Sequence, residues 1–194
     1  MARLTSLCVY CGSSSAVNPT HLEAAASLGR LAAERGVQIV FGGGRVGLMG
    51  VLADAALAAG GAVVGIIPAL LQSREVGHQA ITRLEVVDSM HSRKLRMAAL
   101  SDAFCTLPGG LGTLDETFEI ITWRQLGLHD KPIAIVNLGG FWDPLLSLIG
   151  HQSAGGYIRN DHGKLFTVVD SVEAVFSAVA AAPEPREPSD IRHM

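Results

Sequence analysis

The sequence is poor in lysine, in charged residues generally and in long apolar runs. Lys and Arg together number 15 in 194 residues, and the formal charge is −3 at pH 7. A nucleic-acid surface normally needs a basic stripe, so the composition argues against one. The most apolar segment, residues 55–71, is broken by Gly60, Gly61 and Pro68, and no basic region followed by an apolar stretch opens the chain. We therefore expect a cytoplasmic protein that binds neither nucleic acid nor a membrane.

Cysteine is also scarce, and its three positions suggest no redox or metal chemistry. Cys8 and Cys11 lie along one expected strand, where their odd spacing directs them to opposite faces of the sheet. Cys105 stands alone in another expected strand, and the histidines lack the spacing of metal ligands. We expect structural cysteines and no bound metal.

Glycine and small apolar residues, by contrast, are abundant. The chain has 22 glycines and is 48% apolar, which suits a sizeable core with many tight turns. From Ala182 onward the chain is rich in proline and charged residues. Such a segment cannot bury enough apolar surface to become ordered. The sequence predicts one domain over residues 1–181 and a disordered tail over 182–194.

Runs suited to buried strands alternate with helical patterns along the chain. The strand-like runs cover residues 4–10, 37–41, 62–67, 84–87, 103–107 and 133–136. Helical patterns cover 19–35, 46–59, 89–101, 113–126, 142–149 and 172–181, and the first has Asn18 as its cap and Pro19 at its first position. This alternation predicts an α/β, Rossmann-like, doubly wound and mostly parallel sheet with helices on both faces. Ligands would bind at the carboxyl ends of the strands.

The segment with the clearest chemistry is PGGLGTLDE, residues 108–116, which joins an expected strand to an expected helix. A glycine-rich turn at a helix start can direct backbone amides at an anion, with the helix dipole in support. The groups available for this are the amides of Gly109, Gly110 and Gly112 and the hydroxyl of Thr113. Glu116 follows one helical turn later. The spacing predicts phosphate capture beside acid chemistry.

Two further loops follow expected strands. GGGRVG at residues 42–47 fits the dinucleotide fingerprint GxGxxG, but the next strand ends in Ile67 and Pro68 with no acid for a ribose. We therefore expect no nicotinamide cofactor, and Gly43 with its neighbours either lines a mononucleotide pocket or allows tight packing. Ser14, in the serine run after the first strand, either meets ribose or phosphate or is solvated in its loop.

The expected helix over residues 89–101 carries a mixed stripe of methionines and cations. Met90, Arg93, Lys94 and Met97 share one face at spacings of three and four. An average helix would bury the methionines and leave the cations in water. Because this helix directly precedes the strand that feeds the glycine turn, we favour a site-directed orientation of Arg93 and Lys94.

Three motifs together closely resemble one known family. MHSRK at 90–94, PGGLGTLDE at 108–116 and EIITWRQLGLHDKP at 119–132 resemble the LOG ("lonely guy") family of cytokinin riboside 5′-monophosphate phosphoribohydrolases, often mislabelled as lysine decarboxylases. The resemblance extends to GSSS at 12–15, FGGGRVGLMG at 41–50 and GIIP at 65–68.

The resemblance implies a homodimer that hydrolyses the N-glycosidic bond of AMP or of a cytokinin riboside 5′-monophosphate. The products are the free base and ribose 5-phosphate, and no cofactor is needed. It makes Arg93 and Glu116 the catalytic pair. It also implies contacts to the nucleotide from Glu75, Lys94, Thr122 and the turn containing Gly109, Gly110, Leu111, Gly112 and Thr113; Ser14, Gly43 and Met90 are further candidates. Plant members have an aromatic residue at position 111 and glutamate at 115. This chain departs from them in or next to the glycine-rich turn 109–113, which we call the phosphate cradle.

The residues suit this chemistry better than the alternatives. Cleavage of a ribosyl C–N bond passes through an oxocarbenium-like state. A carboxylate such as Glu116 can stabilise the positive charge of this state or activate the water that attacks it. Lysine decarboxylation needs a Schiff-base lysine, and Lys94 is the only one of three lysines near the site. Phosphoribosyl transfer is disfavoured because Asp115 and Glu116 follow the phosphate loop instead of preceding it. A non-catalytic nucleotide or cofactor carrier, which needs the cradle but not Glu116, remains the alternative.

Overall fold

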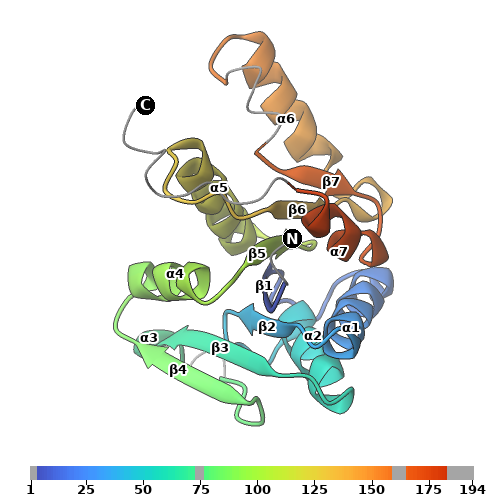
Figure 1. Ribbon diagram of the computed structural model, residues 1–194, viewed down its shortest axis with the longest axis vertical. Coiled ribbons are helices and arrows are strands. Elements are labelled where there is room, and N and C mark those ends of the chain that lie inside the picture. The colour runs from blue at the N-terminus through green and yellow to red at the C-terminus, as the bar shows by residue number, and fades with distance from the viewer. Residues whose placement is uncertain (1–3, 73–76, 159–164, 183–194) are drawn as a thin grey trace.

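A seven-stranded, all-parallel sheet forms the centre of the computed structural model, which describes residues 4–72, 77–158 and 165–182 (Figure 1). The strand order is β4-β3-β2-β1-β5-β6-β7, and every neighbouring pair is parallel. The strands are β1 (Ser6–Tyr10), β2 (Gln38–Phe41), β3 (Val63–Pro68), β4 (Arg83–Val87), β5 (Ala103–Thr106), β6 (Ile133–Val136) and β7 (Thr167–Val169). The predicted Rossmann-like α/β fold is confirmed.

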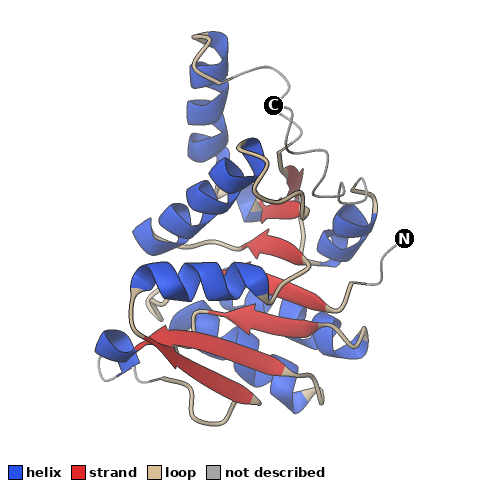
Figure 2. Ribbon diagram, turned by 60° about the vertical axis from the view of Figure 1, so that its left-hand side comes forward, coloured by secondary structure: helices blue, strands red, loops and turns tan. Residues whose placement is uncertain are grey.

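Helices cover both faces of this sheet (Figure 2). One face packs against α1 (Pro19–Glu34), α2 (Gly47–Ala58) and α7 (Glu173–Ala180), and the other against α4 (Met90–Ala99), α5 (Leu111–Gln125) and α6 (Asp143–Ala154). The short helices α3 (Ala69–Gln72) and η1 (Leu138–Gly140) follow β3 and β6. No helix within the described ranges combines the length and hydropathy needed to span a bilayer.

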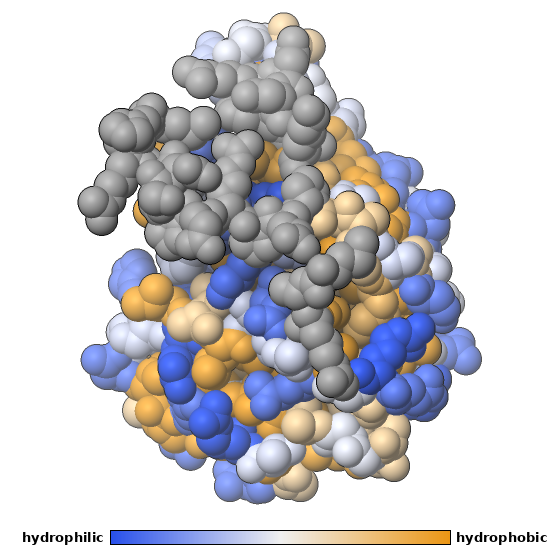
Figure 3. Space-filling model, in the orientation of Figure 1, coloured by the Kyte–Doolittle hydropathy of each residue, from blue (hydrophilic) through white to orange (hydrophobic). Residues whose placement is uncertain are grey.

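The central strands are apolar on both faces because both faces are covered. All five residues of β1 are buried, and Cys8 and Cys11 fall in the two apolar layers on opposite sides of the sheet, as their spacing predicts. At the surface, apolar side chains such as Val86 of β4 and Leu95 of α4 are exposed, and orange residues are visible over this region in Figure 3.

The ends of α1 illustrate how local sequence sets the element bounds. The side chain of Asn18 accepts a hydrogen bond from the amide of Thr20 at 3.0 Å, and Pro19 occupies the first turn. Beyond the last turn, Gly36 adopts φ +66°, a conformation that suits glycine. The predicted start and end of this helix are confirmed.

Several parts of the sequence prediction differ from the structure or fall outside it. β4 was expected as a buried strand, but none of its residues is buried. No strand is predicted at β7, although residues 165–169 (LFTVV) are mostly apolar; only Val169 of this short edge strand is buried. The predicted loop between Pro68 and Thr82 contains the helix α3. Residues 183–194 of the predicted tail lie outside the described residues, so the division at residue 181 stays a prediction.

The strand order reverses direction at β1. From β1 the chain crosses to β2 on one side, and it later returns to place β5 on the other, where Leu7 pairs with Ala103 and Tyr10 with Thr106. The segments that leave the carboxyl ends of β1 and β5 therefore diverge and open a crevice between them. The fold thus brings the glycine turn after β5 beside the end of β1.

Candidate functional site

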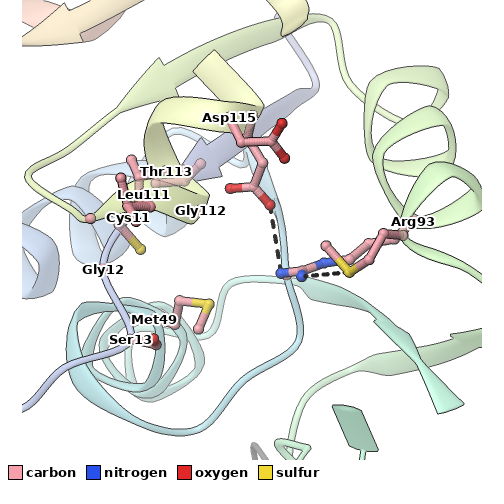
Figure 4. A pocket seen from close by; sticks show the side chains of 14 residues that line it. Cys11, Gly12, Ser13, Met49, Arg93, Leu111, Gly112, Thr113 and Asp115 are labelled. Atoms are coloured by element: carbon pink, nitrogen blue, oxygen red, sulfur yellow. Dashed lines mark hydrogen bonds and ion pairs between the residues drawn. The ribbon is translucent and has the colours of Figure 1, made fainter. Parts of the chain in front are cut away.

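A cavity of about 200 Å³ lies at this edge of the sheet (Figure 4). It is lined by segments from the ends of β1, β2 and β5 and from the starts of α2, α4 and α5. The lining residues are Val9, Cys11, Gly12, Ser13, Gly42, Met49, Met90, Arg93, Gly110, Leu111, Gly112, Thr113, Asp115 and Glu116. Pockets that enclose a whole small ligand usually measure about 300–1,000 Å³. This cavity is smaller, so a nucleotide would extend beyond it.

The start of α5 forms one wall of the cavity. Gly110 is the N-cap, no side chain caps the helix, and the first helical hydrogen bond runs from the amide of Leu114 to the carbonyl of Gly110 at 3.0 Å. The amides of the first turn have no intrahelical acceptor, and the helix dipole makes this end positive. The arrangement is suited to an anion.

The glycines of this turn act through their small size. α5 begins at Leu111, two residues before the predicted start, and none of Gly109, Gly110 and Gly112 has a positive φ. At Gly109 a Cβ would collide with the side chain of Thr113, whereas at Gly110 and Gly112 it would meet nothing within 4 Å. These three glycines therefore do not adopt backbone angles reserved for glycine. Glycine here permits a close turn and leaves the helix amides uncovered.

Arg93 and Glu116 come together in the cavity from α4 and α5. Nη2 of Arg93 lies 3.6 Å from Oε1 of Glu116, and the two residues are only 6% and 9% exposed. Nη1 of Arg93 lies 3.8 Å from Sδ of Met90; Figure 4 marks both contacts with dashed lines. Within the described part of the chain, the buried Nε of Arg93 has no hydrogen-bond partner. An unsatisfied buried donor costs about 1–3 kcal/mol, so Nε of Arg93 is a group that a bound ligand could satisfy.

Lys94 points in another direction and links α4 to α5. Its ammonium donates to Oδ2 of Asp115 at 3.1 Å and pairs with Oε1 of Glu119 at 3.0 Å. Burial lowers the pKa of Lys94, but the hydrogen bonds to Glu119 and Asp115 outweigh burial and raise the pKa above its ordinary value. Lys94 is not among the described residues that line the cavity.

The other predicted site residues are divided between the cavity and its surroundings. Leu111 is 86% exposed at the edge of the cavity, Met90 lines it, and Thr113 is buried in its wall. Thr122 lies exposed on α5, away from the described lining residues. The remaining candidates are Ser14, whose Oγ accepts from the amide of Ala16, Gly43, whose carbonyl accepts from the amide of His78, and Glu75, which lies outside the described residues.

Sequence reasoning assigned no site role to Cys11 or Met49, which line the cavity, and it left Ser13 and Gly42 between a pocket role and a structural one. The signal available for them was their place directly after β1 or β2, or in the first turn of α2. Gly47 brings α2 against β1, since it adopts φ +66° and a Cβ there would lie 2.5 Å from the carbonyl carbon of Ser13. The second glycine-rich turn therefore provides tight packing around the cavity.

The three thiols are buried and protonated. Burial raises the pKa of Cys8, Cys11 and Cys105 well above the ordinary thiol value, so none supplies a thiolate nucleophile. Among the described residues, no group of three or more His, Cys, Asp or Glu is placed to hold a metal ion. The charged groups that line the cavity are the carboxylates of Asp115 and Glu116 and the guanidinium of Arg93, beside the start of α5.

Comparison with known proteins adds the family. A family model described as "Possible lysine decarboxylase" matches residues 49–179. The rice protein "Probable cytokinin riboside 5′-monophosphate phosphoribohydrolase LOGL1" is 44% identical over 159 residues, which cover 82% of this chain and 71% of the rice protein. "Cytokinin riboside 5′-monophosphate phosphoribohydrolase" of Rhodococcoides fascians is 42% identical over 175 residues, covering 90% of this chain and 88% of that one.

Solved structures with the same fold are more distant in sequence. The molybdenum cofactor carrier protein of Chlamydomonas reinhardtii has a TM-score of 0.68 at 19% identity, covering 92% of this chain and 97% of that chain. The molybdenum cofactor binding protein of Rippkaea orientalis has a TM-score of 0.68 at 23% identity, with 93% and 98% covered. At such identities the likeness shows the fold alone. The extent and identity of the match to the curated relatives show that this chain belongs to the LOG family of cytokinin riboside 5′-monophosphate phosphoribohydrolases.

Proposed function

We propose that the protein hydrolyses the N-glycosidic bond of adenine-type nucleoside 5′-monophosphates, AMP or cytokinin riboside 5′-monophosphates, to the free base and ribose 5-phosphate. The observation that carries the proposal is the buried Arg93–Glu116 pair, 3.6 Å apart, beside the uncapped start of α5. The names of the curated relatives support the same reaction. No cofactor takes part.

Each group has a distinct role in this proposal. The amides of residues 110–113 bind the 5′-phosphate and thereby fix the ribose, and such positioning can supply about 7 kcal/mol of barrier reduction. Glu116 stabilises the oxocarbenium-like transition state or activates the attacking water. Arg93, always cationic, orients Glu116 through its Nη2 or binds the ribose hydroxyls through its Nε, which has no hydrogen-bond partner among the described residues. The chemistry therefore takes place between α4 and α5.

We propose the remaining nucleotide contacts on the family resemblance. They are Lys94, next to the cradle through its pair with Asp115, and Leu111 at the edge of the cavity, together with Glu75 and Thr122. Leu111 would meet the base, because the cavity is too small for a whole nucleotide and Leu111 is exposed where the ligand must emerge.

Lysine decarboxylation, the description that the matching family model bears, fits this site poorly. A Schiff-base lysine is normally activated by a lowered pKa. The pKa of Lys94 is raised instead, and its ammonium is paired with two carboxylates. Pyridoxal phosphate followed by borohydride reduction should therefore label Lys94 no faster than Lys131.

The decisive assay incubates the protein with AMP and, separately, with N6-isopentenyladenosine 5′-monophosphate, and measures free base by chromatography. Release of adenine or isopentenyladenine supports the proposed reaction, and the two rates rank the substrates. The alternative is a non-catalytic nucleotide or cofactor carrier. It predicts that wild type and Glu116→Gln bind the nucleotide equally and that neither releases base.

We further propose that the protein is a homodimer that covers the exposed face of α5. Leu111, Asp115, Phe118, Thr122 and Leu126 follow one another on this helix at spacings of three and four, and all five are exposed. The stripe begins at the cavity, since Leu111 and Asp115 line it. A second copy lying on the stripe would bury these apolar side chains and extend the wall of a cavity that is small for a nucleotide.

Sedimentation velocity tests the dimer. Leu126 is 63% exposed. Leu126→Asp should shift the protein from dimer to monomer, because burial of an unpaired carboxylate in the interface has a high desolvation cost. Leu148→Asp, at an exposed apolar residue of α6, is the matched control and should leave the dimer intact. A wild-type monomer at micromolar concentration would contradict the proposal.

We also propose a cytoplasmic location, which suits three unpaired buried cysteines and can be checked by cell fractionation.

A further inference from the structure

Gly42 directly follows β2 and lines the cavity, yet its backbone does not require glycine. It is the first of three consecutive glycines. Gly43, the next, has φ +78°, and Cβ there would also lie 3.2 Å from Cβ of Ile67. Gly42 is not among the positive-φ glycines of the described chain. Its lack of a side chain must therefore be explained by its surroundings.

The neighbour that excludes a side chain at Gly42 is the guanidinium of Arg93. A Cβ built on Gly42 would lie 2.9 Å from Cζ and 3.4 Å from Nε of Arg93, and closer still to Nη2. The three nearest atoms all belong to this one group. The guanidinium therefore lies directly against the bare Cα of Gly42, while its Nη2 is also the atom that faces Glu116 at 3.6 Å.

A methyl group at position 42 would move Arg93 more readily than it would move the backbone. Gly42 belongs to the chain between β2 and α2, which is fixed by sheet pairing on one side and helix packing on the other. Arg93 meets it with the far end of a long, rotatable side chain. A substitution at Gly42 would thus displace the guanidinium from Glu116 at little cost to the fold.

We propose that Gly42 is a positioning residue for the hydrolytic reaction: its missing side chain sets where the Arg93 guanidinium lies relative to Glu116. This inference rests on the proposed roles of Arg93 and Glu116. It gives the first glycine of the GGG turn a purpose distinct from that of Gly43, which meets a backbone requirement. Displacement of a catalytic group by about 1 Å can reduce the rate by about a hundredfold.

The test is a double-mutant cycle of Gly42→Ala with Arg93→Ala, read out as kcat and KM for base release and as the melting temperature. We expect Gly42→Ala alone to lower kcat by about 10- to 100-fold, to change KM by less than about threefold and to leave the melting temperature close to that of wild type. In the Arg93→Ala background the methyl group has no guanidinium to displace, so Gly42→Ala should change the residual kcat by less than about twofold.

Two controls separate this role from a general effect of losing a glycine. Gly150→Ala, in α6 with open space around it, should leave kcat and KM unchanged. Gly43→Ala should lower the melting temperature because of its positive φ. A Gly42→Ala protein that melts as low as Gly43→Ala would show a structural role and overturn the inference.

Other results would also overturn it. An equal loss of kcat from Gly42→Ala with and without Arg93 would mean that the methyl group acts on the nucleotide or the fold, and an unchanged kcat would mean that Arg93 tolerates it. Failure of the proposed function has a different signature, because the wild-type protein itself would then release no base from either nucleotide; that result removes the role of Arg93 and the inference with it.

Discussion

Replacing Glu116 with glutamine removes one negative charge from the cavity while keeping the size of the side chain. The carboxylate is 9% exposed and lies 3.6 Å from Nη2 of Arg93. Glutamine can still donate and accept hydrogen bonds, but it cannot act as a base or stabilise a cationic sugar. The proposed reaction needs one of these abilities in its transition state.

The effect on stability should be modest. At an effective dielectric constant of 20, two unit charges 3.6 Å apart attract by about 4.6 kcal/mol. Desolvation of the buried carboxylate offsets most of this gain, and water in the open cavity screens the rest, so we expect Glu116→Gln to lower the free energy of unfolding by about 1 kcal/mol. The fold should survive.

The effect on catalysis should be larger. Removal of an acid-base group usually costs about a hundredfold or more in rate, which corresponds to a barrier about 2.7 kcal/mol higher. Because the proposed phosphate contacts come from the amides of α5 and not from Glu116, the affinity for AMP should change by less than about threefold. We therefore expect Glu116→Gln to lower kcat and to leave the affinity for AMP nearly unchanged.

Chromatographic measurement of base release from AMP, together with calorimetric measurement of AMP affinity, tests this division. Glu173→Gln, at an exposed residue in the first turn of α7 on the other face of the sheet, is the matched control and should behave as wild type. Equal kcat values for Glu116→Gln and wild type would refute the assignment of Glu116.

Three further predictions follow from other groups. Arg93→Ala should lower kcat by about a hundredfold or more in the same assay, and an unchanged rate would remove Arg93 from the site. Burial should keep all three thiols unreactive toward Ellman's reagent until the protein is unfolded; rapid labelling of the native protein would contradict the raised pKa values of Cys8, Cys11 and Cys105. Burial raises the pKa of Asp102, but hydrogen bonds from Thr5 and Ser6 outweigh it and lower the pKa. The stabilisation by Asp102 is therefore present above pH about 4 and lost as the pH falls through the lowered folded value, so Asp102→Ala should cost about 1 kcal/mol in denaturant melts at pH 7 and less at pH 3. A cost that does not shrink at low pH would contradict this.

Much of the fold could be predicted because its elements have strong local signals. Six of the seven strands appear as apolar runs, although β4, at the edge of the sheet, has no buried residue. The ends of α1 follow from Asn18, Pro19 and Gly36. β7 was not predicted, although residues 165–169 (LFTVV) are mostly apolar or β-branched. Its place in the sheet depends on pairing with β6, which is a tertiary contact.

The site could be predicted in part, for the same physical reason. The convergence of Arg93 and Glu116 follows from the motifs and from the rule that parallel strands end at one edge. The purpose of each glycine could not be predicted, because it depends on where the fold places neighbouring side chains. Gly109 gives room to Thr113, and Gly42 gives room to Arg93. Neither glycine has a positive φ.

The pairing of β1 with β5 has a consequence for the order in which the protein matures. Leu7 lies beside Ala103, so the middle of the sheet joins segments that leave the ribosome far apart in time. Such long-range parallel pairing closes slowly. A nascent chain that stops short of Glu116 has the end of β1 but lacks the wall that faces it. We therefore expect nucleotide binding to appear late in synthesis and all at once, which makes ligand capture a direct report of completed folding.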